Sequence, residues 1–278
     1  MKRESQTSPM SVLSQVMGIV NVTPDSFSDG GRWTSTAAAV DHAMRLVEQG
    51  ADVLDIGGES TRPGAEPVGE AEEIERVAPV IAAVRARWGG PISVDTMKPA
   101  VARAAVAAGA TMWNDVTALS QAPDSLAVAA ELGCAVVLMH MKGEPRTMQA
   151  DPRYGDVVAE VRDYLRDRAE AAMAAGVARE NIWLDPGIGF GKTLEHNMAL
   201  TARLGELAAL GFPVLYAASR KRTIQAVDPT AVEATDRLGG SLALALEGAR
   251  RGARMVRVHD VRETVQALKL QAAVAAAG

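Results

Sequence analysis

The 278-residue sequence has a single cysteine, few aromatic residues and no excess of positive charge, and each shortage excludes a class of protein. Cys134 cannot form a disulfide within the chain, and one thiol cannot build a cysteine-rich metal site. Its small and apolar neighbours favour packing over chemistry. Aromatic residues make up 4% of the chain and the net charge is -5. The sequence therefore lacks both the stacking platform and the basic field that nucleic-acid binding uses.

Long apolar runs are also missing, so the sequence offers no candidate for a membrane-spanning helix. Residues 1–14 are polar and mixed, which predicts a flexible N-terminal segment and not a signal peptide. We therefore expect a cytoplasmic protein without nucleic-acid or membrane partners. Residues 15–278 contain no linker-like stretch, which predicts a single domain.

Short β-branched segments alternate with longer alanine-rich segments of helical periodicity. The alternation favours parallel strands joined by right-handed crossovers. About eight such units in a chain of this length predict a closed (β/α)8 TIM barrel. The predicted strands are 16–22, 53–56, 92–94, 112–114, 135–139, 182–184, 214–217 and 255–258. The predicted helices are 35–49, 70–87, 98–108, 124–132, 156–175, 195–209, 234–251 and 261–276.

Polar residues follow most of the predicted strands, where a barrel exposes its loops on one face. Each of them alone could be a helix cap or a turn residue. Their concentration at the same end of successive strands instead predicts one shared pocket. The set comprises Asn21, Arg62, Asp95, Asn114, Asp185, Lys221, Arg257 and His259.

These residue types divide into two chemical groups. Arg62, Arg257 and His259 are suited to a phosphate or diphosphate, and Asn21 offers a neutral oxygen to a Mg²⁺ shared with phosphate oxygens. The second group is Asp95, Asn114 and Asp185, whose carboxylates and amide can pair with the edge of a flat amino-oxo-pyrimidine. Lys221 could bind a ring carbonyl or ring nitrogen. A planar heterocycle that carries a diphosphate would use both groups.

Two other sequence features, a glycine-rich segment and His140, are not expected to bind nucleotide or to act in catalysis. The segment 187–193 ends in Gly-Lys-Thr, but Pro186 occupies the position of the first glycine of a phosphate-binding P-loop, so we do not expect a nucleotide site there. His140, at the end of a predicted strand, is expected in the pocket wall without a catalytic role.

Several motifs together resemble the dihydropteroate synthases of the pterin-binding enzyme family. The match extends from about residue 15 to 270, and its first two motifs are nearly diagnostic. In order they are Met-Gly-Ile-Val-Asn-Val-Thr-Pro-Asp-Ser-Phe-Ser-Asp-Gly-Gly at 17–31, Asp-Ile-Gly-Gly-Glu-Ser-Thr-Arg-Pro-Gly-Ala at 55–65, Ser-Val-Asp-Thr at 93–96, Leu-Met-His-Met at 138–141, Leu-Asp-Pro-Gly at 184–187, Ser-Arg-Lys at 219–221 and Arg-Val-His-Asp-Val at 257–261.

The resemblance implies a transferase that joins (7,8-dihydropterin-6-yl)methyl diphosphate to 4-aminobenzoate with Mg²⁺, by an SN1-like displacement of diphosphate. It also implies a homodimer. By matching motif it gives Asp95 and Lys221 catalytic roles and assigns the remaining contacts by ligand. These are Asp95, Asn114, Asp185 and Lys221 for the pterin, Arg62, Arg257 and His259 for the diphosphate, Phe27, Thr61, Pro63 and Ser219 for 4-aminobenzoate, and Asn21 for the metal.

Two alternatives share the fold, and one position departs from the family. A methyltransferase acting on methyltetrahydrofolate would use the same aspartate and asparagine set but would not need the diphosphate cations. A non-catalytic relative would bind pterins without turnover.

Ala217 stands two residues before the Ser-Arg-Lys motif, where the family usually has glycine, and its methyl group could narrow the pocket.

Overall fold

The computed structural model describes residues 13–22, 32–60, 66–143 and 148–277, without the side chains of 32–35. Its strands are all parallel and form one sheet in the order β6-β5-β4-β3-β2-β1-β8-β7. The backbone N–H of Leu184 donates to the Pro213 carbonyl over 3.0 Å, and Leu184 also bridges to Val214, so the two edges of the sheet meet. The strands are β1 (Gln15–Asn21), β2 (Val53–Gly57), β3 (Ile92–Asp95), β4 (Met112–Asp115), β5 (Ala135–Met139), β6 (Ile182–Asp185), β7 (Leu215–Tyr216) and β8 (Met255–Val258).

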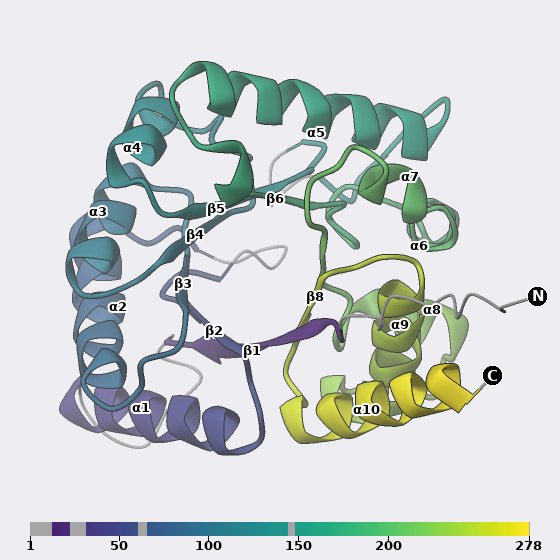
Figure 1. The fold of residues 1–278 in the computed structure, drawn as a ribbon, viewed down its shortest axis with the longest axis horizontal. Coiled ribbons are helices and arrows are strands. Elements are labelled where there is room, and N and C mark those ends of the chain that lie inside the picture. The colour runs from purple at the N-terminus through teal and green to yellow at the C-terminus, as the bar shows by residue number, and fades with distance from the viewer. Residues whose placement is uncertain (1–12, 23–31, 61–65, 144–147, 278) are drawn as a thin grey trace, which may run out of the picture.

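Helices surround the strands on the outside, which confirms the predicted (β/α)8 barrel (Figure 1). Sequence-local caps begin some of them. The Asp156 carboxylate accepts hydrogen bonds from the first turn of α5, and Thr193 forms a reciprocal capping box at the start of α6. The helices are α1 (Arg32–Glu48), α2 (Glu70–Arg85), α3 (Pro99–Ala107), α4 (Ser125–Leu132), α5 (Val157–Ala174), α6 (Leu194–Ala202), α7 (Gly205–Ala208), α8 (Arg222–Val227), α9 (Leu238–Arg250) and α10 (Val261–Ala277), with 3-10 turns η2 (Arg179–Asn181) and η3 (Ala234–Arg237).

The structure differs from the predicted elements mainly in the last third of the barrel. The predicted helix 195–209 is two helices, because the backbone at Arg203 (φ -111°, ψ 22°) leaves the helical region between α6 and α7. The short helix α8 was not predicted, since its six residues are too few to display a periodicity. β7 has two residues where four were expected, because the chain leaves the sheet for the turn at Arg220, whose φ is 58°.

The apolar core has two parts, which lie on opposite faces of the sheet. The larger part fills the space between the strands and the helices, and it includes Leu54 and Val256. The smaller part fills the bottom of the barrel interior, and it consists of Met17, Val53, Met112, Val137, Leu215 and Met255. Side chains along a strand alternate between these two faces, which determines what lies above the interior layer.

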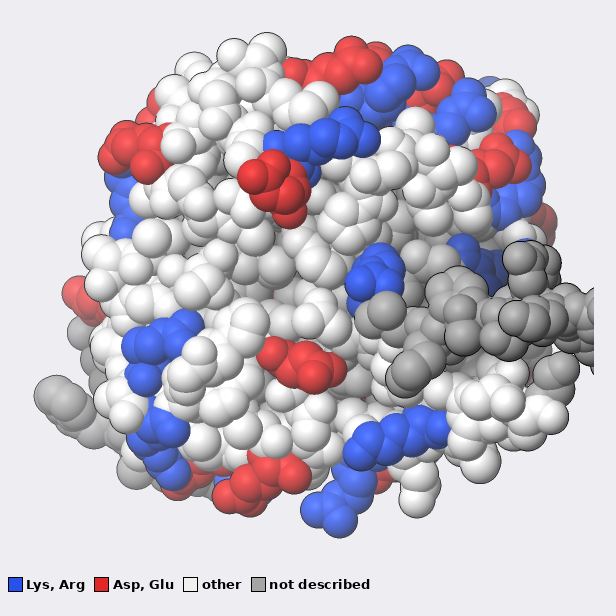
Figure 2. Space-filling model, viewed as in Figure 1, with Lys and Arg blue, Asp and Glu red and all other residues white. Residues whose placement is uncertain are grey.

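Three expectations from composition can be compared with the structure. Cys134 is buried, and burial raises the pKa of its thiol, as suits a packing residue. In the view of Figure 2, cationic and anionic side chains are interspersed over the surface and neither sign forms a continuous field. Within the described ranges, no helix has the length and apolarity that crossing a bilayer would require.

Candidate active site

A layer of polar side chains lies directly above the apolar layer inside the barrel. Val53 and Met255 belong to the apolar layer, so the residues two positions further along, Asp55 and Arg257, face the same interior. The same spacing from Met112 brings Asn114 inward. The mouth of a barrel at the carboxyl ends of its strands is where enzymes of this fold carry their chemistry. The polar layer is therefore the candidate active site.

Arg257 is the centre of this layer, because it binds two carboxylates from different strands. Its Nε donates to Asp55 Oδ2 over 2.5 Å, and its Nη2 donates to Asp95 Oδ2 over 2.8 Å. Asn114 Nδ2 donates to the same Asp55 oxygen over 3.2 Å. Within the described part of the chain, Nη1 of Arg257 donates to no residue, so with respect to these residues it is open to a ligand.

Burial and charge shift the ionisation of this group. Burial raises the pKa of Asp95 to about 7, and the neighbouring charge of Asp55 adds to that shift, while Arg257 opposes it. Burial alone would lower the pKa of Arg257, but Asp55 and Asp95 outweigh it, and the net shift is upward. The guanidinium is thus a permanent cation, whereas Asp95 changes its charge near neutral pH.

Asp185 and Lys221 form a second part of the site, together with the loop that follows β6. Asp185 is 3% exposed, and its Oδ1 accepts a hydrogen bond of 2.7 Å from Gly187 N. Lys221 Nζ donates to the Ile188 carbonyl and lies 4.7 Å from the centre of the Phe190 ring. Burial raises the pKa of Asp185 and lowers that of Lys221 to about 8, although each charge favours the other. A buried carboxylate with a lysine beside it can bind both the donors and the acceptors of a planar ring.

Ser219 and His259 lie side by side at the ends of β7 and β8. Ser219 Oγ is 3.0 Å from His259 Nδ1, and it accepts a hydrogen bond of 3.2 Å from His259 N. Arg220 turns away from them, because its Nε donates to Asp260 over 3.0 Å. The predicted 4-aminobenzoate residue Ser219 and the predicted diphosphate residue His259 are therefore neighbours. Ala217, the departure from the family pattern, is buried close by.

Asn21 ends β1 and is half-buried, on the same inward-facing series as Met17. Its amide can give a metal one neutral oxygen. Among the described residues, no cluster of three or more histidine, cysteine or acidic side chains could hold a metal ion. Mg²⁺ commonly keeps several waters and binds through few protein ligands together with substrate phosphates. A single amide at this mouth fits such a shared ion and does not fit a metal held by protein alone.

Four predicted site residues lie outside the described part of the chain: Phe27, Thr61, Arg62 and Pro63. The flanks of the segment 61–65 are described and anchored. Glu59 Oε1 accepts a hydrogen bond of 2.9 Å from Val68 N, across that segment. Lys98 Nζ lies 2.8 Å from Glu59 and 2.5 Å from Glu73, so the base of this loop is tied to α2 and α3.

Sequence reasoning assigned no role to Asp55, although it lies at the centre of the site. Asp55 is fully buried, and its Oδ1 has no hydrogen-bond partner among the described residues. A carboxylate inside the apolar run Val-Leu-Asp-Ile-Gly was the signal that could have identified it, because an unpaired buried charge is costly. Lys192 and its contact with His140 were missed as well, since the glycine-rich motif around Lys192 was considered only as a nucleotide loop.

Comparison with known proteins identifies relatives of the whole chain. The family model described as pterin binding enzyme matches residues 17–259. The dihydropteroate synthase of Escherichia coli (strain K12) is 49% identical over 255 residues, which cover 92% of this chain and 89% of that protein. The Xanthomonas albilineans dihydropteroate synthase with 4-aminobenzoic acid is 53% identical with a TM-score of 0.89, covering 95% of this chain and 94% of that one. The same enzyme in complex with 7,8-dihydropteroate is 50% identical with a TM-score of 0.86, over 95% and 94% of the two chains.

The chain therefore belongs to the pterin binding enzyme family. Within that family it groups with the dihydropteroate synthases, which are transferases of folate biosynthesis. This grouping disfavours the methyltransferase alternative. The assignment of individual residues to substrates is a separate matter.

Proposed function

We propose that this chain joins (7,8-dihydropterin-6-yl)methyl diphosphate to 4-aminobenzoate and releases 7,8-dihydropteroate and diphosphate. The proposal rests on the interior polar layer. In this layer Asp95, Asn114 and Asp185, the residues suited to the edge of a pterin, share one barrel mouth with the cation Arg257. The relatives solved with 4-aminobenzoic acid and with 7,8-dihydropteroate support 4-aminobenzoate as a substrate and 7,8-dihydropteroate as the product.

The pterin ring would lie between Asp185 and the Arg257 group. Asp185 keeps Oδ2 for ring N–H donors while Gly187 N occupies Oδ1. The Asn114 amide offers both a donor and an acceptor, and Lys221 offers a donor to the ring carbonyl or nitrogen. A pocket whose buried polar groups require this pairing would reject analogues that leave them unpaired.

The diphosphate would lie at the cationic side of the mouth. Arg257, His259 and Arg62 are its proposed ligands, with the free Nη1 of Arg257 as the described donor. Asn21 would hold Mg²⁺ together with diphosphate oxygens. When bound, Mg²⁺ would neutralise the charge that develops on the leaving group.

The displacement proposed is SN1-like. The bond between the pterin methylene carbon and the diphosphate oxygen breaks first, and its electron pair leaves with the diphosphate. Asp95, when ionised, would stabilise the cation left on the pterin. The neutral arylamine nitrogen is already nucleophilic, so it needs no strong general base to form the new carbon–nitrogen bond. The resulting acidic ammonium then gives its proton to water. Lys221 would hold the pterin in place during both steps.

The second substrate and the assembly complete the proposal. Phe27, Thr61, Pro63 and Ser219 would surround 4-aminobenzoate, and Ser219 is the one of these within the described residues. We further propose that the chain acts in the cytoplasm as a homodimer. Light scattering of the purified protein tests the proposed dimer.

One assay decides between this function and a relative that binds pterins without turnover. The purified chain is incubated with both substrates and Mg²⁺, and diphosphate and dihydropteroate are measured together. Equal amounts of both products are expected. Binding of 7,8-dihydropteroate without any turnover would instead identify a non-catalytic pterin-binding protein. Absence of both binding and turnover would refute the proposed function.

A further inference from the structure

The glycine-rich segment after β6 directs its lysine into the protein. Lys192 is 3% exposed, and its Nζ lies within hydrogen-bonding distance of three acceptors. They are His140 Nδ1 at 3.0 Å, the His140 carbonyl at 3.2 Å and the Phe190 carbonyl at 3.0 Å. An ammonium group has three hydrogens and no acceptor, so these contacts use every donor of the side chain.

The arrangement requires one tautomer of His140. While Lys192 is charged, Nδ1 of His140 must accept from its ammonium, and the ring proton then lies on Nε2. Burial lowers the pKa of His140 to about 3, and the nearby Lys192 charge acts in the same direction, so the ring is neutral at physiological pH. Burial also lowers the pKa of Lys192 to about 7, although Asp185 favours its charge.

Glycines allow the segment to lie directly on the chain around His140. Gly187 has a φ of +68°, and a Cβ there would come within 1.9 Å of the His140 carbonyl oxygen. Gly191 has a φ of +62°, and a Cβ there would come within 2.3 Å of the Lys142 carbonyl oxygen. No other residue type fits either position, so the close approach that Lys192 needs is built into the sequence.

The same segment supports the pterin side of the site. Gly187 N binds the Asp185 carboxylate, while the Ile188 carbonyl accepts from Lys221 and the Phe190 ring lies beside that ammonium. Lys192 Nζ donates to the Phe190 carbonyl over 3.0 Å. A shift of Phe190 would therefore move the groups that orient Lys221 and Asp185.

We propose that Lys192 is a positioning residue of the pterin pocket, which fastens the 186–193 segment to His140 and so determines where Asp185 and Lys221 stand. This inference rests on the proposed function for the identity of the ligand. Lys192 contacts no substrate in this scheme and acts through the segment alone. The P-loop-like Gly-Lys-Thr sequence thus has a role that involves no nucleotide.

The test compares Lys192→Met with Lys269→Met, an exposed lysine on α10. In Lys192→Met, the affinity for 7,8-dihydropteroate, measured by titration, should fall about 10-fold or more. That is the size of effect expected from the loss of one charged hydrogen bond. The KM for the pterin diphosphate should rise while the KM for 4-aminobenzoate changes little. Lys269→Met should match the wild type in both. Circular dichroism verifies that each variant is folded.

Nitrogen-15 NMR of histidine-labelled protein provides a readout that simple loss of stability would not produce. In the wild type, His140 should be the Nε2–H tautomer. In Lys192→Met, His140 should populate both the Nε2–H and the Nδ1–H tautomers. If Lys192→Met does not fold, His140→Asn, which can retain an acceptor, is compared with His140→Leu. The Asn variant should bind dihydropteroate several-fold more tightly than the Leu variant.

Unchanged dihydropteroate affinity in folded Lys192→Met, or equal affinity in the two His140 variants, would overturn the inference. Failure of the wild type to bind dihydropteroate would instead refute the proposed function. The tautomer of His140 can be measured without any ligand, so the contact with Lys192 would still be testable in that case.

Discussion

Asp55 on β2 and Arg257 on β8 are 202 residues apart in the chain and are joined by a hydrogen bond of 2.5 Å inside the barrel. The Asp55 carboxylate is fully buried and also binds Asn114, so it orients one proposed ligand of the diphosphate and one of the pterin. A residue with no assigned substrate contact thereby determines the geometry of both halves of the site.

Removing the Asp55 charge should disturb both halves. Asp55→Ala leaves the Arg257 guanidinium with one carboxylate and Asn114 without its acceptor. Breaking a buried pair by removing one partner costs about 3–5 kcal/mol. We expect a loss of unfolding free energy near the lower end of that range, because Asp95 still pairs with Arg257, together with severe loss of turnover. Urea unfolding and the diphosphate-release assay measure the two effects.

Asp41→Ala is the matched control for that experiment. Asp41 forms an exposed pair with Arg87 at 3.5 Å, with side chains 63% and 52% exposed. Such pairs contribute about 0–1 kcal/mol. A loss in Asp55→Ala no larger than in this control would contradict the proposed positioning.

Asp185→Asn should greatly weaken pterin binding and leave the barrel folded. The amide keeps the size of the carboxylate but replaces one acceptor oxygen with a donor, which would face the donors of the ring. Titration with 7,8-dihydropteroate measures the loss, and circular dichroism reports the fold. Unchanged affinity would refute the role assigned to Asp185.

Arg257→Ala should harm the binding of the pterin diphosphate more than the binding of dihydropteroate. Both ligands lose some affinity, because Asp55 and Asp95 lose their partner, but only the substrate loses a diphosphate contact. The ratio of the two affinities is therefore the quantity to measure. Equal losses would argue against a diphosphate role for Arg257.

The stability of the protein should depend on pH through Asp95. Its folded-state pKa of about 7 lies above the unfolded value near 4, so the folded state holds a proton that the unfolded state releases. This contribution is complete below about pH 4 and is lost as the pH rises through about 7. Urea unfolding between those values should show the wild type losing up to about 1.4 kcal/mol per pH unit relative to Asp95→Asn. Asp115, with a pKa raised to about 6 by burial, acts in the same direction in both proteins. A parallel pH dependence of the two proteins would contradict the expected titration.

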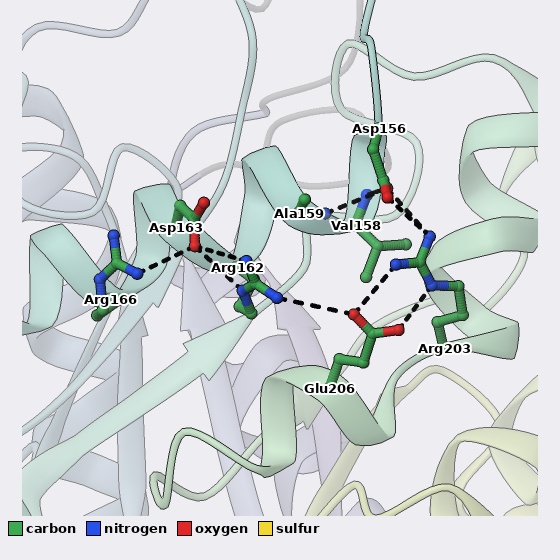
Figure 3. A network of polar contacts seen from close by, with 8 residues as sticks. All are labelled: Asp156, Val158, Ala159, Arg162, Asp163, Arg166, Arg203 and Glu206. Atoms are coloured by element: carbon green, nitrogen blue, oxygen red, sulfur yellow. Dashed lines mark hydrogen bonds and ion pairs between the residues drawn. The ribbon is translucent and has the colours of Figure 1, made fainter.

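A surface network at the start of α5 gives a prediction about stability alone (Figure 3). Asp156 caps α5 by accepting from Val158 N at 2.9 Å and Ala159 N at 3.2 Å, and it also binds Arg203. Asp156→Ala should lower the melting temperature, because the first turn of α5 loses its N-cap acceptor.

Asp163→Ala is the control in the same network. Asp163 pairs with Arg162 and Arg166 at the surface but caps no helix, so its loss should be smaller. Thermal unfolding of both variants measures the difference. Equal losses would mean that the ion pairs, and not the cap, carry the effect.

Much of the barrel was predictable because its signals are local. β5 and β8 have the predicted bounds. β5 is a short apolar run, β8 is apolar except at Arg257, and a histidine follows each strand. The predicted helix 195–209 was wrong as a single helix, because the backbone leaves the helical region at Arg203 and the periodic pattern of the sequence does not mark that break. The residues Asp95, Asn114, Asp185 and Arg257 were predicted to share one pocket, and the structure brings them to one mouth. The substrate roles of these residues stay predictions, as do those of Phe27, Thr61, Arg62 and Pro63.

The sequence by itself determined the alternation of strands and helices, the face on which the loops emerge and the family to which the motifs point. These features depend on the order of the residues and on the spacing of apolar residues, which repeats every two residues in a strand and every 3.6 in a helix. Only the tertiary structure decided that Asp55 binds Arg257 and that Lys192 binds His140. Those contacts join residues distant in the chain, and they arise from barrel closure and from the burial of charges that must find partners within it.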